Sequence, residues 1–127
     1  MSKQIVSTEN APAAIGPYSQ AVIANGFVFS AGQLGVVPQT KQFAGDDVQS
    51  QTRQALENLK AILEAAGSSL DKVVKVTVFL ADINDFAAMN EVYATYFTEN
   101  FPARSAVEVA NLPLGGRVEI EAVAALD

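Results

Sequence analysis

The sequence predicts an α+β fold in which two amphipathic helices cover one face of a small mixed β-sheet. Apolar residues recur at helical spacing in two stretches, at about residues 47–66 and 84–99. Short runs rich in β-branched and aromatic residues surround them, in the order ββαβαββ, with room for one more short strand near the N-terminus. Two helices on one face of one sheet are enough to enclose a core.

Length and composition limit the size of this fold. The chain has 127 residues, of which 50% are hydrophobic and 17% are charged, as in folded globular proteins with one core. No linker, internal repeat or low-complexity tract divides it. We therefore expect a single domain over residues 1–127.

The N-terminal third is expected to contain a loop and a β-hairpin. Residues 11–18 include two prolines, and the residue before a proline avoids helical dihedral angles, so an irregular loop is expected there. Strands are expected at residues 19–24 and 27–32, because the Asn25-Gly26 pair between two apolar runs favours a tight hairpin turn. A loop with a proline and a glycine then leads to the first helix.

The first helix is expected over residues 47–66. Asp46 or Asp47 can cap its start by accepting hydrogen bonds from free backbone N–H groups, and Gly67 is typical of the residue that follows a helix. The apolar stripe of this helix consists of Thr52, Ala55, Leu56, Leu59, Ile62, Leu63 and Ala66.

A valine-rich strand is expected at residues 72–81. Alternation predicts one face with Val74, Val76, Val78 and Leu80, and an opposite face with Val73, Lys75, Thr77 and Phe79. If the helices cover the first face, the second remains half apolar and uncovered. Because such a face is usually buried by a partner, the pattern predicts oligomerisation.

The second helix is expected over residues 84–99, with Asn84 as its cap and Pro102 as the residue that stops it. Its stripe consists of Phe86, Met89, Val92, Tyr93, Tyr96 and Phe97. Strands at residues 104–110 and 117–125 complete the chain. The glycine pair between them lacks the lysine of a phosphate-binding loop, so a hairpin turn is the simpler expectation.

The absence of cysteine and histidine limits the chemistry of this protein. It excludes disulfides, thiol nucleophiles, thiolate metal sites and imidazole bases. Catalysis must then use carboxylate, guanidinium, hydroxyl, amide or ammonium groups. We expect no metal site, although a hard-cation site of carboxylates stays open as an alternative.

The charge and the hydropathy pattern bear on partners and location. A net charge of −6 without a basic cluster repels phosphate, so we expect neither nucleic acid nor an anionic membrane as a partner. No apolar run approaches the length needed to cross a bilayer, and the N-terminal residues lead into no signal-peptide core. The expected location is therefore the cytoplasm.

Arg104 and Glu119 are the leading candidates for chemistry. Arg104 lies where a proline-stiffened loop enters a strand, and its planar guanidinium suits bidentate binding of a carboxylate; the alternative is a surface salt bridge. Glu119 should point away from the helices, since Val118 and Ile120 point toward them. If that side is an interface, burial raises the pKa of Glu119 and suits it to acid–base catalysis; the alternative is a solvated strand residue.

Three further residues are candidates for binding. Tyr18 could close a pocket and offer its hydroxyl, or pack its ring on the core. Gly32 permits close backbone approach to a ligand, or only a turn. Asn90, in the second helix, could hold a loop carbonyl or lie in solvent.

Several segments resemble motifs of the RidA/YjgF/YER family. Residues 102–113, PARSAVEVANLP, and residues 118–121, VEIE, are similar to the family signature. Residues 14–21, AIGPYSQA, resemble its N-terminal motif; Gly32-Gln33 resembles its strand-end element, and residues 84–90 its second-helix motif. These segments span nearly the whole chain in the family's order.

The resemblance implies a chorismate-mutase-like α+β fold and a homotrimer with a central β-barrel and sites between subunits. It also implies that the protein hydrolyses 2-iminobutanoate and 2-iminopropanoate to 2-keto acids and ammonia without a cofactor. These two imino acids are unstable products released by pyridoxal-phosphate enzymes. By this resemblance Arg104 would bind the substrate carboxylate, and Glu119 would assist the attack of water or transfer a proton. Tyr18 would close the site from the neighbouring subunit. Backbone groups near Gly32 and Ala106 would contact the substrate or water, and Asn90 would support the site.

Two positions depart from the family pattern. Ala31 stands where many relatives have Ser or Thr, and Ala106 stands where a cysteine is common. Two other functions remain as alternatives: a non-catalytic module that binds small 2-keto acids, and a nuclease or translation inhibitor. The acidic charge and the lack of histidine argue against the second.

Overall fold

The computed structural model describes residues 2–127, which form one main β-sheet, a small β-ribbon and two α-helices. Across the main sheet the strands follow the order β1 (Gln4–Val6), β2 (Ala21–Ala24), β3 (Phe27–Ser30), β9 (Val118–Ala125), β7 (Val73–Leu80) and β8 (Ala103–Glu108). β4 (Gln33–Leu34) continues the line of β3 along β9, and β5 (Val36–Val37) pairs with β6 (Gln42–Phe43) in the ribbon. All pairs are antiparallel except β7 with β8.

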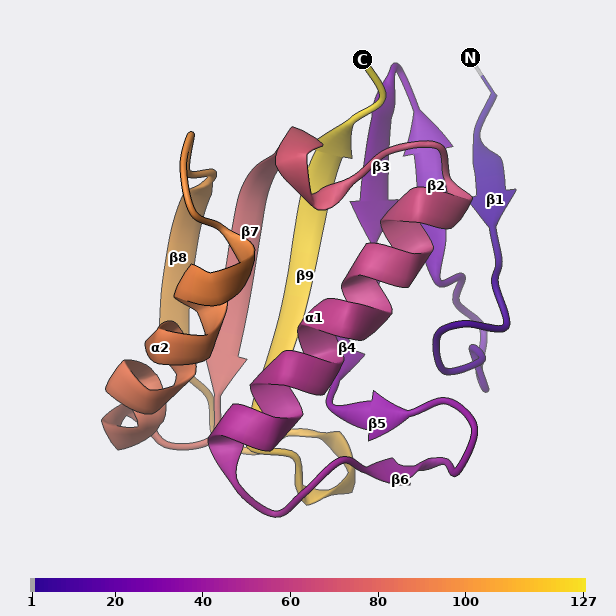
Figure 1. The fold of residues 1–127 in the computed structure, drawn as a ribbon. Coiled ribbons are helices and arrows are strands. Elements are labelled where there is room, and N and C mark those ends of the chain that lie inside the picture. The colour runs from indigo at the N-terminus through magenta and orange to yellow at the C-terminus, as the bar shows by residue number, and fades with distance from the viewer. Residues whose placement is uncertain (1) are drawn as a thin grey trace.

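Both helices, α1 (Val48–Ala65) and α2 (Phe86–Tyr96), lie on the same face of the main sheet (Figure 1). The core fills the space between them, and its completely buried side chains include Leu56, Leu59, Ile62, Leu63, Val76, Val78, Leu80, Val118 and Ile120. The predicted α+β arrangement is therefore confirmed, as is the predicted orientation of Val118 and Ile120 toward the helices.

The ends of α1 follow the predicted capping chemistry. The carboxylate of Asp47 accepts a hydrogen bond of 2.9 Å from the backbone N–H of Ser50. Gly67 adopts a φ of 89°, and the N–H of Ser68 donates to the carbonyl of Leu63 at 2.8 Å. This pair of features is a Schellman motif, which needs a left-handed residue after the helix.

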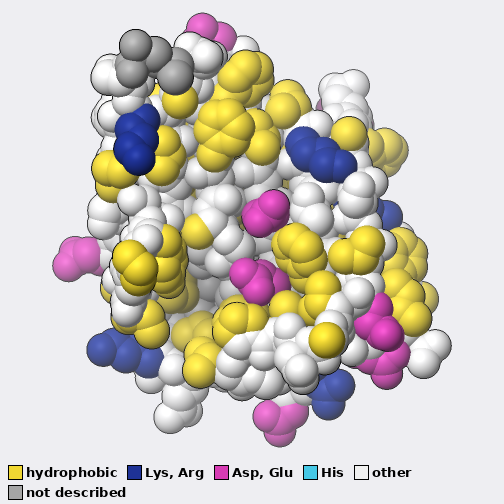
Figure 2. Space-filling view, turned by 180° about the vertical axis from the view of Figure 1, so that it is seen from behind, with side chains coloured by type: hydrophobic (Ala, Val, Ile, Leu, Met, Phe, Trp, Pro, Cys, Tyr) yellow, Lys and Arg dark blue, Asp and Glu magenta, His cyan; other side chains and the backbone are white. Residues whose placement is uncertain are grey.

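The face of the main sheet that points away from the helices, here called the open face, mixes apolar and charged side chains. Its members include Phe27, Phe29, Lys75, Thr77, Phe79, Val107, Glu119, Glu121 and Val123. Phe29 and Val107 are 45% and 44% exposed although both are apolar. On this side of the molecule, hydrophobic side chains surround central acidic ones (Figure 2). The predicted uncovered, half-apolar face is thus present.

The predicted faces of β7 are wrong at its first two residues. Val73 is buried at 6% exposure and Val74 is 46% exposed, the reverse of the prediction. The pairing of β7 with β9 shifts register between Val73 and Lys75. Such a bulge adds one residue and turns the preceding side chains to the other face.

The predicted second helix is too long and its predicted cap is wrong. A 3₁₀ turn at Ile83–Asp85 precedes α2, and the side chain of Asp82 caps it by accepting from the N–H of Asn84 at 2.9 Å. α2 ends at Tyr96, well before Pro102, because Phe97 turns to extended backbone and buries its ring in the core. Proline therefore does not end this helix.

The expected hairpin between the last two strands is also absent. β9 lies between β3 and β7, whereas β8 pairs in parallel with the other side of β7. The connection, with a 3₁₀ turn at Pro113–Gly115, must therefore pass β7. β4, β5 and β6 lie in a region expected to be loop, since each has only two residues and no readable alternation.

The described residues give two further results. No helix within residues 2–127 is long and apolar enough to cross a membrane. No group of three or more His, Cys, Asp or Glu side chains in the same part of the chain is placed to hold a metal ion.

Candidate active site

Arg104 lies on the edge strand β8 and faces α2. It is paired with Val76, whose side chain is buried beneath the helices, so both side chains point to that face. Nη1 of Arg104 donates a hydrogen bond of 2.7 Å to Oδ1 of Asn90. Its Cζ lies 4.5 Å from the ring centroid of Tyr93 and 5.4 Å from that of Phe86.

The surroundings of Arg104 correct two expectations. Arg104 makes no ion pair within residues 2–127, so the surface salt bridge is wrong as an interpretation. The amide oxygen of Asn90 accepts a hydrogen bond from the guanidinium of Arg104. Asn90 therefore neither holds a loop carbonyl nor lies only in solvent, the two roles expected from the sequence. Phe86, Asn90 and Tyr93 share one face of α2, at positions i, i+4 and i+7. We call these three residues and Arg104 the arginine cluster.

Ala106 lies two residues beyond Arg104 on the same face of β8. It pairs with Val78 and packs partly buried against the core. Its methyl group offers no hydrogen bond, so any polar contact at this position must come from the backbone.

Glu119 lies on β9 in the middle of the open face, opposite to the helices, as predicted. Two causes raise the pKa of its carboxyl: partial burial is the larger, and the charge of Glu121 on the same face is the smaller. The carboxylate lies against Gly32, since a Cβ built there would be 2.8 Å from Cδ and 2.9 Å from Cγ of Glu119. Gly32 therefore makes room for the Glu119 side chain, and we call these two residues the glutamate cluster.

Tyr18 lies in the loop between β1 and β2. These two strands form the edge of the sheet opposite to β8 (Figure 1). Its backbone N–H donates to the carbonyl of Gly16 at 2.8 Å, and its side chain is 54% exposed. The ring therefore does not pack on the core of this chain.

Two residues near Tyr18 and Gly32 have structural contacts that sequence patterns did not reveal. Gln20 is buried, accepts from the N–H of Thr8 at 2.7 Å and donates to the carbonyl of Pro12 at 2.8 Å, and so holds the loop before Tyr18. Ser30, at the end of β3, accepts from the N–H of Ala122 at 3.0 Å. Its hydroxyl is thus used within the sheet.

The predicted site residues do not come together in one chain. The arginine cluster and Ala106 lie on the helix face of an edge strand, the glutamate cluster lies on the open face, and Tyr18 lies at the opposite edge. Sequence reasoning also missed Phe86 and Tyr93 as contacts of Arg104, because both were assigned to the core stripe of the helix.

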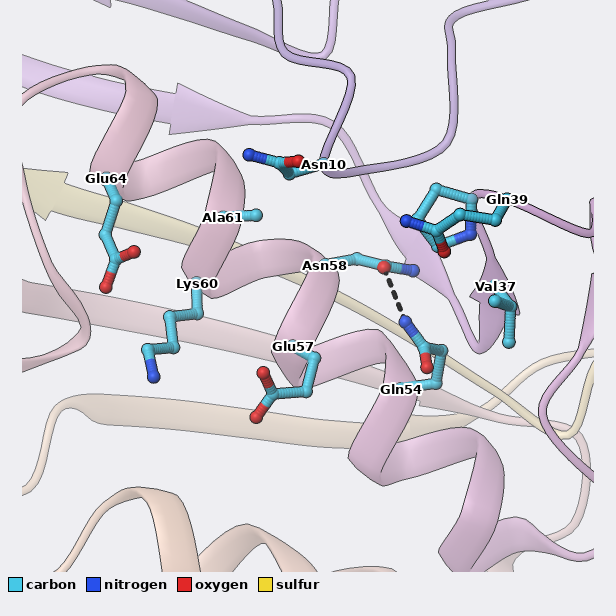
Figure 3. Close-up of a pocket in the computed structure, with 10 residues that line it drawn as sticks. Asn10, Val37, Gln39, Gln54, Glu57, Asn58, Lys60, Ala61 and Glu64 are labelled. Atoms are coloured by element: carbon cyan, nitrogen blue, oxygen red, sulfur yellow. Dashed lines mark hydrogen bonds between the residues drawn. The ribbon is translucent and has the colours of Figure 1, made fainter.

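Two hollows of the structure lie away from these residues. One groove of about 420 Å³ runs between α1 and the loops around β5 (Figure 3). Asn58 forms part of its wall and donates to the carbonyls of Leu34 and Val36, while it accepts from Gln54. A hollow of about 280 Å³ on the open face is lined by Phe29, Ser30, Lys75, Thr77, Glu121, Ala122 and Val123. Neither includes a predicted site residue.

Comparison with known proteins places this geometry in a family. The family model described as endoribonuclease L-PSP matches residues 8–126. A RutC family protein of Pyrococcus horikoshii is 60% identical over 122 residues, which are 96% of this chain and 97% of that protein. The chain belongs to the RidA/YjgF family.

Two other members of the RidA/YjgF family bear on its activity. A goat protein named 2-iminobutanoate/2-iminopropanoate deaminase is 55% identical over 122 residues, 96% of this chain and 89% of that protein. The structure of Escherichia coli TdcF with bound serine has a TM-score of 0.92 at 49% identity, over 96% of this chain and 98% of that one. The names of the relatives support a deaminase.

Proposed function

We propose that this protein hydrolyses 2-imino acids such as 2-iminobutanoate and 2-iminopropanoate to 2-keto acids and ammonia. The observation that carries the proposal is the state of Arg104. One of its five N–H donors binds Asn90, and no carboxylate within residues 2–127 pairs with the guanidinium. A held guanidinium with free donors suits the carboxylate that every 2-imino acid carries. The name of the goat relative supports the choice of substrate.

The complete site requires a second copy of the chain. Arg104 and Glu119 face opposite sides of the sheet, and Tyr18 lies at the far edge, so one chain cannot present all three to one small molecule. The apolar side chains of the open face favour its burial against another copy. We propose a homotrimer with sites between subunits, where the number three comes from the family resemblance.

In the proposed reaction Arg104 holds the substrate carboxylate, and water adds to the imine carbon. The new C–O bond forms as the C=N electron pair moves to nitrogen, and one proton of the water passes to that nitrogen through Glu119, which gives a carbinolamine. The protonated Glu119 carboxyl then donates its proton to the amino group, the C–N bond breaks, and ammonia leaves as the C=O bond forms. The proton of the carbinolamine hydroxyl returns to Glu119, which restores its starting state. The raised pKa of Glu119 favours the protonated carboxyl that this step requires. Positioning of the reactants supplies much of the rate.

Binding without turnover is the second candidate function. The serine bound to TdcF supports a site in this family for small molecules that carry a carboxylate. A module of this kind needs the arginine cluster but not the Glu119 carboxyl. A nuclease is disfavoured by the net charge of −6 and the absence of histidine.

The test is a coupled assay in which threonine dehydratase generates 2-iminobutanoate and semicarbazide traps it. The wild-type protein should lower the yield of semicarbazone and Arg104→Ala should not. Arg53→Ala is the matched control, because Arg53 is exposed on α1 and its guanidinium binds no acceptor within residues 2–127. If neither wild type nor control changes the trapping, the deaminase proposal is wrong for this substrate.

A further inference from the structure

Two aromatic rings of α2 lie against the guanidinium of Arg104. The guanidinium carbon lies 4.5 Å from the ring centroid of Tyr93 and 5.4 Å from that of Phe86. Both distances are within the range of a cation–π interaction. The single hydrogen bond to Asn90 acts at Nη1. Arg104 is thus held by two kinds of contact, one with ring faces and one with an amide oxygen.

Tyr93 is the central member of this arrangement. Its ring also packs on Phe97, with centroids 4.6 Å apart and an angle of 30° between the ring planes. Tyr93 and Phe97 are only 6% and 5% exposed. Phe97 therefore fixes Tyr93 from behind, and Tyr93 presents a rigid ring to the arginine.

The hydroxyl group of Tyr93 does not explain why this residue lies here. Its oxygen is buried and has no hydrogen-bond partner within residues 2–127. Burial raises the pKa of the phenol, and the charge and the hydrogen-bonding capacity of the neighbouring Arg104 guanidinium oppose this shift only in part. The phenol is therefore neutral at physiological pH, and the guanidinium lies over a neutral ring.

We propose that Tyr93, with Phe86 beside it and Phe97 behind it, is a positioning residue for Arg104. The rings set the plane of the guanidinium, and Asn90 sets its rotation within that plane. The remaining N–H donors then point in a fixed direction as a fork for a carboxylate. The inference rests on the proposed function only for the identity of the ligand, since the geometry of the arginine is a property of the free protein.

The physical gain is preorganisation. A free arginine side chain loses conformational freedom when it binds a ligand, whereas an arginine already held by rings and an amide loses little. Cation–π contacts of this kind correspond to about a 3- to 30-fold change in affinity. We expect removal of the Tyr93 ring to weaken carboxylate binding by that factor.

The test follows the NMR signals of the arginine side chains, which are few enough to be assigned individually. The chain contains only Arg53, Arg104 and Arg117, so a ¹⁵N-labelled protein gives three side-chain Nε–H signals, which Arg→Lys variants assign. A proton held over an aromatic ring resonates upfield. We expect the Arg104 signal to move downfield in Tyr93→Leu and to stay in place in Tyr93→Phe, which keeps the ring. Affinity for 2-oxobutanoate, measured by titration, should fall about 3- to 30-fold in Tyr93→Leu alone.

Val92→Ala is the matched control, because Val92 is a buried residue of α2 that cannot stack on the guanidinium. It should leave the Arg104 signal and the 2-oxobutanoate affinity unchanged. If Tyr93→Leu does not fold, Phe86→Leu removes the more distant ring and should give a smaller shift in the same direction.

The outcomes separate this inference from the proposed function. An unchanged Arg104 signal in Tyr93→Leu, or equal losses in Tyr93→Phe and Tyr93→Leu, would overturn the positioning role of the ring. If the Arg104 signal moves in Tyr93→Leu but the wild-type protein shows no deaminase activity, the positioning role is supported and the proposed function is refuted.

Discussion

Replacement of Gly32 by alanine tests whether the glutamate cluster acts in catalysis. The added Cβ would lie 2.8 Å from Cδ and 2.9 Å from Cγ of Glu119, whereas ordinary van der Waals contacts begin at 3.4 Å. The side chain of Glu119 must therefore move by about 0.6 Å at Cδ, and by more at its carboxylate oxygen. Because the carboxylate is the end of a flexible, partly exposed side chain, it can move without unfolding the sheet.

The expected losses differ between stability and activity. Overpacking costs about 1–3 kcal/mol, and the mobility of Glu119 places Gly32→Ala near the lower limit, at about 1 kcal/mol. A displacement of reacting groups on the order of 1 Å costs about 100-fold in rate, so we expect deaminase activity to fall about 10- to 100-fold. Activity should therefore be lost from a protein that remains folded.

The assay combines semicarbazide trapping with thermal unfolding. Gly26→Ala is the control, since Gly26 lies in the hairpin turn with a φ of 80° and no atom within 4 Å of an added Cβ. It should cost stability through backbone strain, of about 1 kcal/mol, and leave activity intact. In a Glu119→Ala background, Gly32→Ala should cost no further activity, because no carboxylate remains to be displaced.

Two results would refute this argument. Gly32→Ala could remain folded and retain activity within about threefold of wild type, which would show that catalysis tolerates displacement of the Glu119 carboxylate. Alternatively, Gly32→Ala could lower activity equally in the Glu119→Ala background. That result would assign Gly32 a direct role with the ligand instead.

Substitutions at Glu119, Tyr96 and Phe29 test three other parts of the structure. Glu119→Gln should lower turnover strongly but leave measurable residual activity, because an amide cannot transfer the proton. The raised pKa of Glu119 penalises its charged form, so Glu119→Gln should also raise the unfolding temperature at pH 7, more than Glu121→Gln does; this gain should vanish below about pH 4.5, where the unfolded chain is also protonated. The hydroxyl of Tyr96 donates to Glu57 at 2.7 Å, and burial, followed by this contact, raises the pKa of Tyr96 to about 12. In alkaline denaturation the stability of the wild type should therefore fall from pH 10 to 12 more steeply than that of Tyr96→Phe. Phe29→Asp should give monomers in light scattering and lose activity, because this exposed ring lies on the open face; an unchanged mass would contradict burial of that face.

Local periodicity predicted most of the fold because it depends on few residues. The stripe of α1, the capping by Asp47 and the end at Gly67 all follow from side chains within the helix and its flanks. The alternation of β9 placed Val118 and Ile120 under the helices and Glu119 on the other face. Each of these features is determined by neighbours in the sequence.

Periodicity failed where the backbone departs from a regular repeat. The bulge in β7 exchanged the faces of Val73 and Val74, and no side chain in that run marks it. The short strands β4, β5 and β6 contain too few residues for alternation to be read. In α2 the deciding factor was tertiary, since burial of Phe97 in the core ends the helix before the proline.

Residue patterns alone were enough to indicate the α+β class, the family resemblance and the residue types available for catalysis. The parallel pairing of β8 with β7 at the edge of the sheet became visible only in the folded chain, and it turns Arg104 toward Tyr93 and Asn90 and away from Glu119. The reason is that strand order depends on pairing between distant segments, whose free energy comes from burial of the whole core. Local patterns specify which face of each strand is apolar, but they do not specify which strands become neighbours.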